Sequence, residues 1–208
     1  MKKIRVDDCI CKAQMSDHHV LKNMILKSID HNNHLEEIRS KEGFDNIKVT
    51  RADYSAMESM DRPWVQKFLP NFKITMRTML SSLGYTGYLP TALWYHQYSE
   101  GDKYGWHIHD NQYGGIYYLE MGRSSARTEF LYPFNRKKVK INVKEGDMII
   151  FPGHLMHRGL LNGKDRKTVI SFNFNLDVNS PLDLSIVPGA SQKDLPMMTT
   201  WTITTPKT

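Results

Sequence analysis

Between residues 89 and 177 the chain is a series of short segments of β-type composition that are separated by turn signals. Glu145-Gly146-Asp147 and Asn162-Gly163 are the clearest of these turns. Many short strands at near-regular spacing fold into a sandwich or a barrel. The pattern therefore predicts a mainly β fold with jelly-roll or cupin-like closure. The expected strands are 91–98, 114–120, 138–143, 148–151, 156–161 and 167–176.

The segments before and after this β region have a different character. Residues 1–88 are expected to form a mostly helical N-terminal support region, and residues 178–208 a Ser/Thr/Pro-rich C-terminal extension. One helix is expected to follow an N-cap at Asp17, and a second to span 71–83 and end at Gly84. Their apolar stripes, which we expect to pack in the core, are Leu21, Met24, Ile25 and Ile29 in the first and Phe72, Met76, Met79, Leu80 and Leu83 in the second.

The composition supports one domain of ordinary size, because 40% of the 208 residues are hydrophobic. No apolar run approaches the about eighteen residues of a membrane span, and the N-terminus lacks the apolar core of a secretory signal. The two cysteines, Cys9 and Cys11, are too few and too close to staple the chain, which favours a reducing compartment. The net charge of +6 permits an anionic ligand. No motif that reads nucleic acid is present, so nucleic acid is not the expected partner.

Three histidines form the candidate metal site. His107 and His109 stand two positions apart, and on a strand such residues point the same way and form a pincer for one ion. A pincer plus one remote histidine, here His157, is how a small β-barrel holds a catalytic iron. The neighbouring Asp110 points away from His107 on a regular strand, which favours His109 as the third ligand. A local bulge would swing Asp110 inward instead, and both alternatives stay open.

Arg166 is the candidate anchor for an anion. If Asn162-Gly163 is a two-residue hairpin turn, His157 pairs with Thr168, and Arg166 shares the face of both side chains. That face is apolar further along the strand, so we expect it to look into the barrel. A buried guanidinium needs an anion, and these strands offer no obvious carboxylate. A dicarboxylic co-substrate fits, with one end on the metal and the other held by Arg166 in a bidentate bond beside Thr168.

Four patches of the β region share one pattern in order and spacing. They are Gln97-Tyr98-x-x-Gly101-x-x-Tyr104-x-x-His107-x-His109, then Gly115-Ile-Tyr-Tyr118-Leu, then Thr128-Glu-Phe130, and finally Gly146-Asp-x-Ile-Ile-Phe-Pro152, continued by His157-x8-Arg166 and Ser171-Phe-Asn. Taken together, the patches resemble those of the 2-oxoglutarate/Fe(II)-dependent oxygenases. The nearest resemblance is to the phage and bacterial group of these proteins, and prolyl-hydroxylase-like enzymes are more distant.

This resemblance implies a double-stranded β-helix that uses Fe(II), 2-oxoglutarate and O2. By the same resemblance, His107 and His157 are iron ligands, and Arg166 binds the distal carboxylate of 2-oxoglutarate. Tyr104 and Tyr118 stand where members of the family hydrogen-bond the co-substrate.

The chain departs from the common family pattern at the third ligand. That pattern is H-x-D, which supplies two histidines and a carboxylate. Here His109 stands at the i+2 position, as is usual in the phage-type group, and the carboxylate comes one residue later, at Asp110. A third neutral ligand leaves more positive charge on the iron and favours anionic ligands.

The expected function is that of a non-haem Fe(II)- and 2-oxoglutarate-dependent dioxygenase, an oxidoreductase that acts as a hydroxylase. Two alternatives stay open: a three-histidine cupin-type dioxygenase that needs no keto acid, and a non-catalytic barrel that binds an anionic ligand. The substrate is open among small molecules, peptides and nucleobases, and the sequence does not indicate an oligomeric state. The expected location is the cytoplasm, or the host cytoplasm if the chain is phage-encoded.

Overall fold

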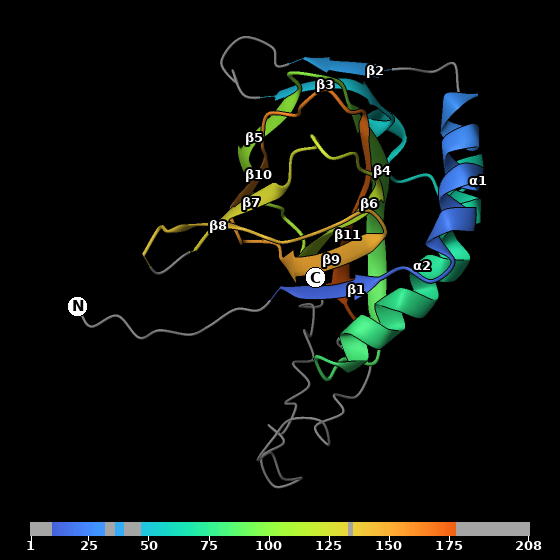
Figure 1. The fold of residues 1–208 in the computed structure, drawn as a ribbon. Helices are drawn as coiled ribbons and strands as arrows, with labels where there is room; N and C mark the ends of the chain where they lie inside the picture. Colours follow the sequence, from blue (N-terminus) through green and yellow to red (C-terminus); the bar gives the residue numbers. More distant parts are fainter. Residues whose placement is uncertain (1–9, 32–35, 40–46, 133–134, 178–208) are drawn as a thin grey trace, which may run out of the picture.

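The protein is described by a computed structural model for residues 10–31, 36–39, 47–132 and 135–177 (Figure 1). The helices are α1 (His18–Asp30), α2 (Pro63–Ser81) and the short 3-10 helix η1 (Tyr54–Ala56). The strands are β1 (Cys11–Gln14), β2 (Glu36–Arg39), β3 (Ile47–Ala52), β4 (Tyr88–Tyr98), β5 (Lys103–His107), β6 (Tyr113–Glu120), β7 (Thr128–Leu131), β8 (Lys138–Lys140), β9 (Asp147–Pro152), β10 (His157–Gly159) and β11 (Lys167–Leu176).

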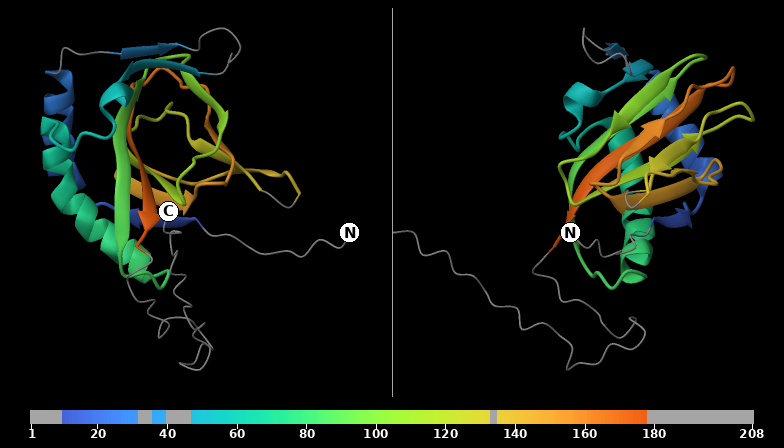
Figure 2. Two further views of the ribbon diagram at one scale, coloured as in Figure 1. Left: turned by 180° about the vertical axis from the view of Figure 1, so that it is seen from behind. Right: turned by 90° about the vertical axis from the view of Figure 1, so that its left-hand side faces the viewer.

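The strands form one 11-stranded sheet that curls around a central space (Figures 1 and 2). Their order is β1-β9-β6-β11-β4-β3-β5-β10-β7-β8, and β2 pairs with β3 beside this path. Strands β9, β6, β11 and β4 make one wall, and β5, β10 and β7 lie opposite (Figure 1). All the pairings are antiparallel. This architecture is the double-stranded β-helix, and the predicted fold class is confirmed.

The N-terminal region supplies strands to this sheet as well as helices. Strand β1 pairs with β9, and β3 pairs with both β4 and β5, so it joins the two walls of the barrel. Helices α1 and α2 lie against the outer face of the wall that contains β4 and β11 (Figures 1 and 2). The described residues of this region, 10–31, 36–39 and 47–88, therefore both complete the barrel and cover one of its sides.

Both predicted helices are present, with differences in their caps, bounds and buried faces. Met24, predicted to pack in the core, is 44% exposed, and α2 ends at Ser81 and not at residue 83. Asp17 occupies the N-cap of α1, but its side chain makes no cap hydrogen bond. Helix α2 begins at Pro63, so the predicted start at residue 71 is wrong. Pro63 suits the first turn, where no backbone donor is needed, and Pro70 lies within the helix without ending it.

The wall between the helices and the cavity has a hydrophobic core on each side. The outer core lies between the helices and the sheet, and includes Trp64, Phe68, Phe72, Tyr117, Phe172 and Phe174. The inner core lies inside the barrel, and includes Tyr98, Tyr118, Phe130, Phe151 and Val169. Because both faces of the wall are covered, both faces of its strands carry apolar residues.

The face of β11 that looks into the barrel is the opposite of the predicted one. Strand β10 pairs with β5 and β7, whereas β11 pairs with β4 and β6. The two strands thus lie in opposite walls, and the predicted hairpin that pairs His157 with Thr168 is wrong. Ile170, Phe172 and Phe174 pack in the outer core, and the side chains that line the barrel cavity are Lys167, Val169, Ser171 and Asn173.

Asn162 explains why the chain crosses between walls instead of turning back. Its side chain is buried, and its Nδ2 lies within hydrogen-bonding distance of the carbonyl oxygens of Tyr98, Ser99 and Asp165, the last at 2.8 Å. Its backbone nitrogen donates to the carbonyl of Asp102 at 2.8 Å. The Asn162-Gly163 segment is therefore tied to the β4–β5 loop and not folded as a two-residue hairpin.

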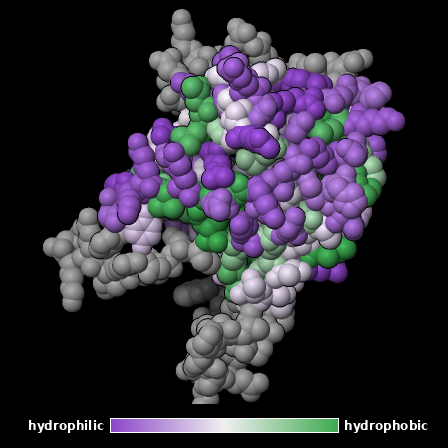
Figure 3. All heavy atoms as spheres, viewed as in Figure 1, coloured by the Kyte–Doolittle hydropathy of each residue, from purple (hydrophilic) through white to green (hydrophobic). Residues whose placement is uncertain are grey.

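Within the described residues, no helix is long and apolar enough to cross a membrane. Figure 3 shows the face of Figure 1 with hydrophilic side chains over most of it and smaller hydrophobic groups between them.

Candidate metal centre

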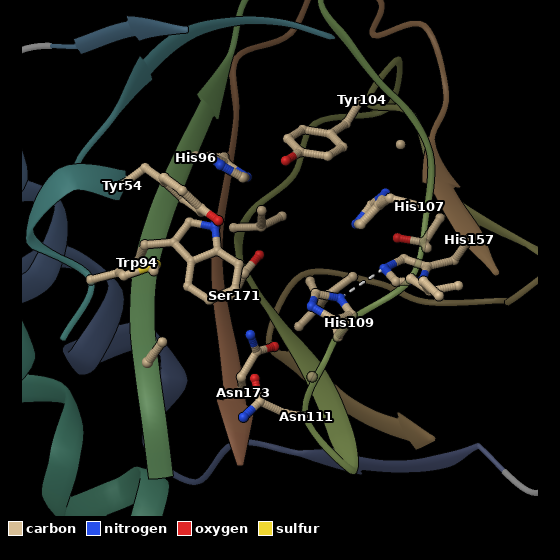
Figure 4. A pocket seen from close by; sticks show the side chains of 18 of the residues that line it. Tyr54, Trp94, His96, Tyr104, His107, His109, Asn111, His157, Ser171 and Asn173 are labelled. Atoms are coloured by element: carbon tan, nitrogen blue, oxygen red, sulfur yellow. Dashed lines mark hydrogen bonds between the residues drawn. The ribbon is translucent and has the colours of Figure 1, made fainter. Parts of the chain in front are cut away.

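A cavity of about 380 Å³ lies inside the barrel between its two walls (Figure 4). Strands β4 and β11 line one side of it with Trp94, His96, Lys167 and Ser171, and the candidate metal ligands line the other side. The cavity is therefore the place where an ion held by the histidines would meet a second molecule.

The structure brings His107, His109 and His157 together. One ring nitrogen from each lies within 4.8 Å of the others, and the Nε2 atoms of His109 and His157 are 3.3 Å apart. His107 ends β5 and is the cross-strand partner of His157 at the start of β10. His109 lies two residues beyond the end of β5, so the two members of the predicted pincer are not on one regular strand.

Backbone carbonyls orient two of the three rings. The Nδ1 of His107 lies 2.8 Å from the carbonyl oxygen of Gly105, and the Nδ1 of His157 lies 2.9 Å from that of Leu155. A carbonyl can only accept, so each Nδ1 carries the proton and each Nε2 keeps a free lone pair. Such partners fix the tautomer and the ring direction that a metal ligand needs.

Burial keeps the three imidazoles neutral. It lowers the pKa of His107, and burial together with the nearby His107 lowers the pKa of His109 to about 4. The pKa of His157 lies well below its usual value, chiefly through burial and then through His107. Neutral imidazole is the form that binds a metal ion, so the chemistry of this donor set fits iron or another divalent transition metal.

Two glycines hold the loop that carries His109. The His109 nitrogen donates to the Gly153 carbonyl at 2.9 Å, and the Gly153 nitrogen donates to the Gln112 carbonyl at 2.7 Å. A Cβ on Gly153 would lie 1.9 Å from the carbonyl oxygen of Asn111, and one on Gly114 would lie 3.0 Å from the His109 ring. At Gly153 only glycine allows the approach of the backbone oxygen, whereas at Gly114 a Cβ would require a small shift of the His109 and Phe151 rings. The off-strand position of His109 is thus built into the surrounding backbone.

Asp110 lies in a different place from the three histidines. It lines the cavity as an exposed residue, and it is not part of the group whose ligand atoms converge. Of the two alternatives for the third ligand, the geometry therefore brings His109 to the cluster and leaves the Asp110 carboxylate beside it.

Arg166 and Thr168 lie outside the cavity, so the expectation that they face inward is wrong. The Arg166 guanidinium binds both carboxylate oxygens of Glu120, at 2.9 and 3.0 Å, and its side chain is 45% exposed. The hydroxyl of Thr168 donates to the same carboxylate at 2.7 Å. Since β11 turns this face away from the barrel, Arg166 finds its anion in Glu120 on β6 and needs no co-substrate.

Lys167, which the sequence reasoning missed, is the cation that enters the cavity. Its residue is 3% exposed, its Nζ lies 4.1 Å from the centre of the Tyr98 ring, and it donates to the Ala126 carbonyl at 3.1 Å. Within the described part of the chain no carboxylate forms an ion pair with it. Burial lowers the pKa of Lys167 to about 8. The signal that could have found Lys167 is its position in β11 one residue after Arg166, because successive side chains of a strand point to opposite faces of the sheet.

The two predicted tyrosines both lie inside the barrel. Tyr104 lines the cavity, with its ring centre 4.6 Å from that of His107. Tyr118 is buried in the inner core, and its hydroxyl is 2.7 Å from the hydroxyl of Thr128, which lines the cavity. Tyr104 thus contacts the histidine group directly, whereas Tyr118 reaches the cavity through Thr128.

His96 is a further buried group in this wall. Its ring stacks on that of Tyr104 at 5.3 Å, and its Nε2 has no hydrogen-bond partner among the described residues. Burial, followed by the nearby His107 and Lys167, lowers the pKa of His96 to about 3. His96 is therefore a neutral group that faces the cavity.

Comparison with known proteins defines the class of this fold. No protein-family model and no curated protein matches the sequence. Among solved structures, a 2OG-Fe(II) oxygenase family oxidoreductase from Burkholderia pseudomallei is similar with a TM-score of 0.56 and 13% identity, over 79% of this chain and 83% of that one. A prolyl-4-hydroxylase from Pseudomonas putida is similar with a TM-score of 0.56 and 10% identity, over 81% and 93% of the two chains.

A prolyl hydroxylase from Trichoplax adhaerens, solved with a peptide fragment of a hypoxia inducible factor, is similar with a TM-score of 0.59 and 14% identity, over 88% and 87% of the two chains. At these identities the likeness establishes the fold, which is that of the 2-oxoglutarate/Fe(II) oxygenases. The resemblance expected from the four sequence patches is confirmed at that level.

Proposed function

We propose that the protein is a non-haem Fe(II)- and 2-oxoglutarate-dependent dioxygenase, an oxidoreductase that hydroxylates its substrate. The observation that supports this most is the pairing of two groups across one cavity. A neutral three-histidine cluster lies on one side, and Lys167, a buried cation without a carboxylate partner in the described structure, lies on the other. A metal ion and a dicarboxylate together complete both groups.

The histidines supply the metal-binding part of the site. The Nε2 atoms of His107 and His157 are free because the Nδ1 atoms are engaged with backbone carbonyls, and the His109 Nε2 lies beside them. When bound there, Fe(II) and 2-oxoglutarate supply the O2-dependent chemistry that oxidises a C–H bond. The protein fixes the ligands beforehand and thereby reduces the reorganisation needed at the moment of reaction.

Lys167 supplies the anchor for the far carboxylate of the keto acid. An ammonium group buried in this way needs an anion, and a carboxylate brings both charge and hydrogen-bond acceptors. Thr128, whose hydroxyl is paired with that of Tyr118, lines the same cavity and offers a neutral hydrogen bond. The proposal therefore gives Lys167 the role that the sequence suggested for Arg166.

Aromatic side chains keep water from the inner side of the cluster. The rings of Phe151 and Phe130 lie 4.6 and 5.5 Å from that of His157, and both are buried. Tyr104 covers His107 from another side. A dry, shaped site of this kind is what the protein contributes to metal chemistry.

The low cysteine count supports the cytoplasm as the proposed location of the protein.

The proposal is tested by anaerobic titration of the protein with Fe(II) and 2-oxoglutarate, followed by measurement of succinate formed on admission of air. We expect a visible charge-transfer band and succinate from the wild type, and loss of both in Lys167→Met. Arg166→Met, which removes the neighbouring cation on the outer face, is the matched control and should retain both. If Lys167→Met turns over normally without 2-oxoglutarate, a three-histidine dioxygenase that needs no keto acid replaces this proposal.

A further inference from the structure

The cavity continues along the β4–β11 wall beyond the reach of a keto acid held by Lys167. In this wall Lys167 is paired with Tyr98, and Ser171 is paired with Trp94. Four residues along a strand correspond to about 13 Å. A five-carbon dicarboxylate has four C–C bonds of about 1.5 Å, so it spans less than about 8 Å. Because the Lys167 Nζ stays beside the Tyr98 ring, a keto acid that reaches from it to the histidines ends beside Trp94, whose ring centre lies 6.4 Å from that of His109. The wall from Trp94 onward to Asn173 and Thr91 is left for another molecule.

This outer half of the cavity has buried polar atoms with no partner. The indole Nε1 of Trp94, the hydroxyl of Thr91 and the side-chain oxygen of Asn173 are all buried and lack a hydrogen-bond partner among the described residues. Trp94 is only 5% exposed, and all three residues line the cavity. Figure 4 shows Trp94, Ser171 and Asn173 along one wall with the three histidines opposite. The wall therefore presents donors and acceptors together, which is the complement of an amide group.

Two carboxylates lie on the Trp94 side of the cavity, because Glu58 follows Met57, which is hydrogen-bonded to Leu93, and Asp110 follows His109, whose ring centre lies 6.4 Å from that of Trp94. The cationic side chains that line the cavity, apart from histidine, are Lys167 and Arg158. Arg158 is already bound to the buried Glu129 at 2.8 and 2.6 Å. Glu58 and Asp110 line the cavity as exposed residues, and within the described structure neither carboxylate has an ion-pair partner. Beside a 2-oxoglutarate held by Lys167, two carboxylates without an ion-pair partner favour a cationic group of the substrate over an anionic one.

Aromatic rings complete this half. Tyr54 meets Trp94 edge-on, with ring centres 5.5 Å apart and planes at 82°. The backbone nitrogen of Leu93 donates to the Met57 carbonyl at 2.8 Å, which ties the segment after η1 to β4. Aromatic faces beside carboxylates are the surroundings in which proteins bind organic cations.

We propose that the outer half of the cavity is a substrate subsite for a positively charged, amide-bearing group, and specifically for a peptide segment that carries lysine or arginine. This proposal rests on the proposed function for the place of the reaction. Trp94, Asn173 and Thr91 bind the amide groups, and Glu58 and Asp110 bind the basic side chain. Anionic substrates are rejected by the same two carboxylates.

The test measures binding of the peptides acetyl-Gly-Gly-X-Gly-Gly-amide, with X as Lys, Arg, Gln or Glu, to the protein loaded anaerobically with Fe(II) and 2-oxoglutarate. We expect the Lys and Arg peptides to bind about tenfold more tightly than the Glu peptide at low salt, with the Gln peptide between them. Added salt should reduce the difference, because the carboxylates are exposed.

Three variants separate the contributions. Glu58→Gln combined with Asp110→Asn should remove the preference for basic peptides, and Asn173→Leu should weaken all four peptides alike. Glu100→Gln, an exposed carboxylate of the β4–β5 loop outside the cavity, should leave the preference unchanged. The proposal is overturned if the Glu peptide binds as tightly as the Lys peptide, if the double variant keeps the preference, or if a protein that binds 2-oxoglutarate binds none of the peptides. Failure to bind 2-oxoglutarate refutes the proposed function instead.

Discussion

Replacing Lys167 with methionine separates the charge of this residue from its volume. Burial lowers the pKa of Lys167 from 10.5 to about 8. At 1.36 kcal/mol for each pKa unit, holding the charged form of Lys167 without a bound anion costs about 3 kcal/mol. Lys167→Met keeps an unbranched side chain that is one heavy atom shorter, and it removes this cost. We therefore expect the unliganded variant to be more stable than the wild type by about 1–3 kcal/mol at pH 7.

The pH dependence of the stability tests the lowered pKa of Lys167 independently. Since the pKa is lower in the folded state, the folded protein loses this proton at about pH 8, whereas the unfolded chain keeps it up to about 10.5. Between these values the unfolded state binds more protons, so stability rises with pH. The cost is fully present below about pH 8 and is relieved as the pH approaches 10.5. In Lys167→Met this contribution to the slope should be absent.

Binding of 2-oxoglutarate should respond in the opposite direction. The charged Lys167 is the form that binds a carboxylate, so affinity should fall as the pH rises above about 8. Removing one partner of a buried charge pair costs about 2–5 kcal/mol, which corresponds to a loss of at least about thirtyfold in Lys167→Met. Urea unfolding without ligand and anaerobic calorimetry with Fe(II) and 2-oxoglutarate measure the two effects. A variant that binds 2-oxoglutarate like the wild type and gains no stability would refute the reasoning.

The structure makes three further predictions. Gly153→Ala should lower the stability by about 1–3 kcal/mol and weaken Co(II) binding, because the added Cβ would meet the Asn111 carbonyl oxygen and displace the loop of His109. Urea unfolding measures the stability, and Co(II) absorption measures metal binding. His109→Asp should keep Co(II) binding but lower the affinity of the bound metal for azide several-fold, since it adds a negative charge; an unchanged azide affinity would place His109 away from the metal. Arg166→Met should lower stability by less than about 1 kcal/mol, because its ion pair with Glu120 is partly exposed, and should leave 2-oxoglutarate affinity unaltered.

The strands of the barrel were predicted well where both local composition and turn signals were strong. The predicted 167–176 matches β11, and 114–120 and 148–151 differ from β6 and β9 by single residues at their ends. The predicted 138–143 extends beyond β8, because the apolar alternation continues after the cross-strand partner β7 has ended. The local sequence pattern therefore indicates where a strand can form, and the length of the partner strand determines where it ends.

The strands of the N-terminal region could not be predicted in this way. Strand β1 has only four residues, and its partner β9 lies more than a hundred residues further on. Strand β3 lies in the polar, mixed sequence between residues 30 and 61, and pairs with both β4 and β5. Such strands exist because an unpaired sheet edge is available to them, which is a property of the finished barrel.

Arg166 was predicted to face the barrel interior because the two faces of β11 cannot be told apart by their apolar content alone. Alternation along β11 divides its side chains into two faces, and a shift of one residue exchanges them. The more apolar face predicts the barrel interior, but helices α1 and α2 cover the outside and make it the more apolar side. The interior of this barrel is the polar face, with Lys167 and Ser171. An apolar strand face indicates burial, and it does not say on which side of the sheet the cavity lies.

The three-histidine cluster and the acidic cavity opening are connected through one carboxylate. In the H-x-D pattern the carboxylate at i+2 lowers the charge of the metal centre, whereas here a neutral imidazole takes its place. With Fe(II), doubly charged 2-oxoglutarate and protonated Lys167, the inner half of the proposed site has a net charge of +1. Asp110, one residue further on, lines the same cavity without joining the cluster. Asp110 then acts, under the proposed function, on the incoming substrate through its charge and does not coordinate the metal. Under the proposed function, moving this carboxylate by one residue changes it from a metal ligand into a selector of substrate charge.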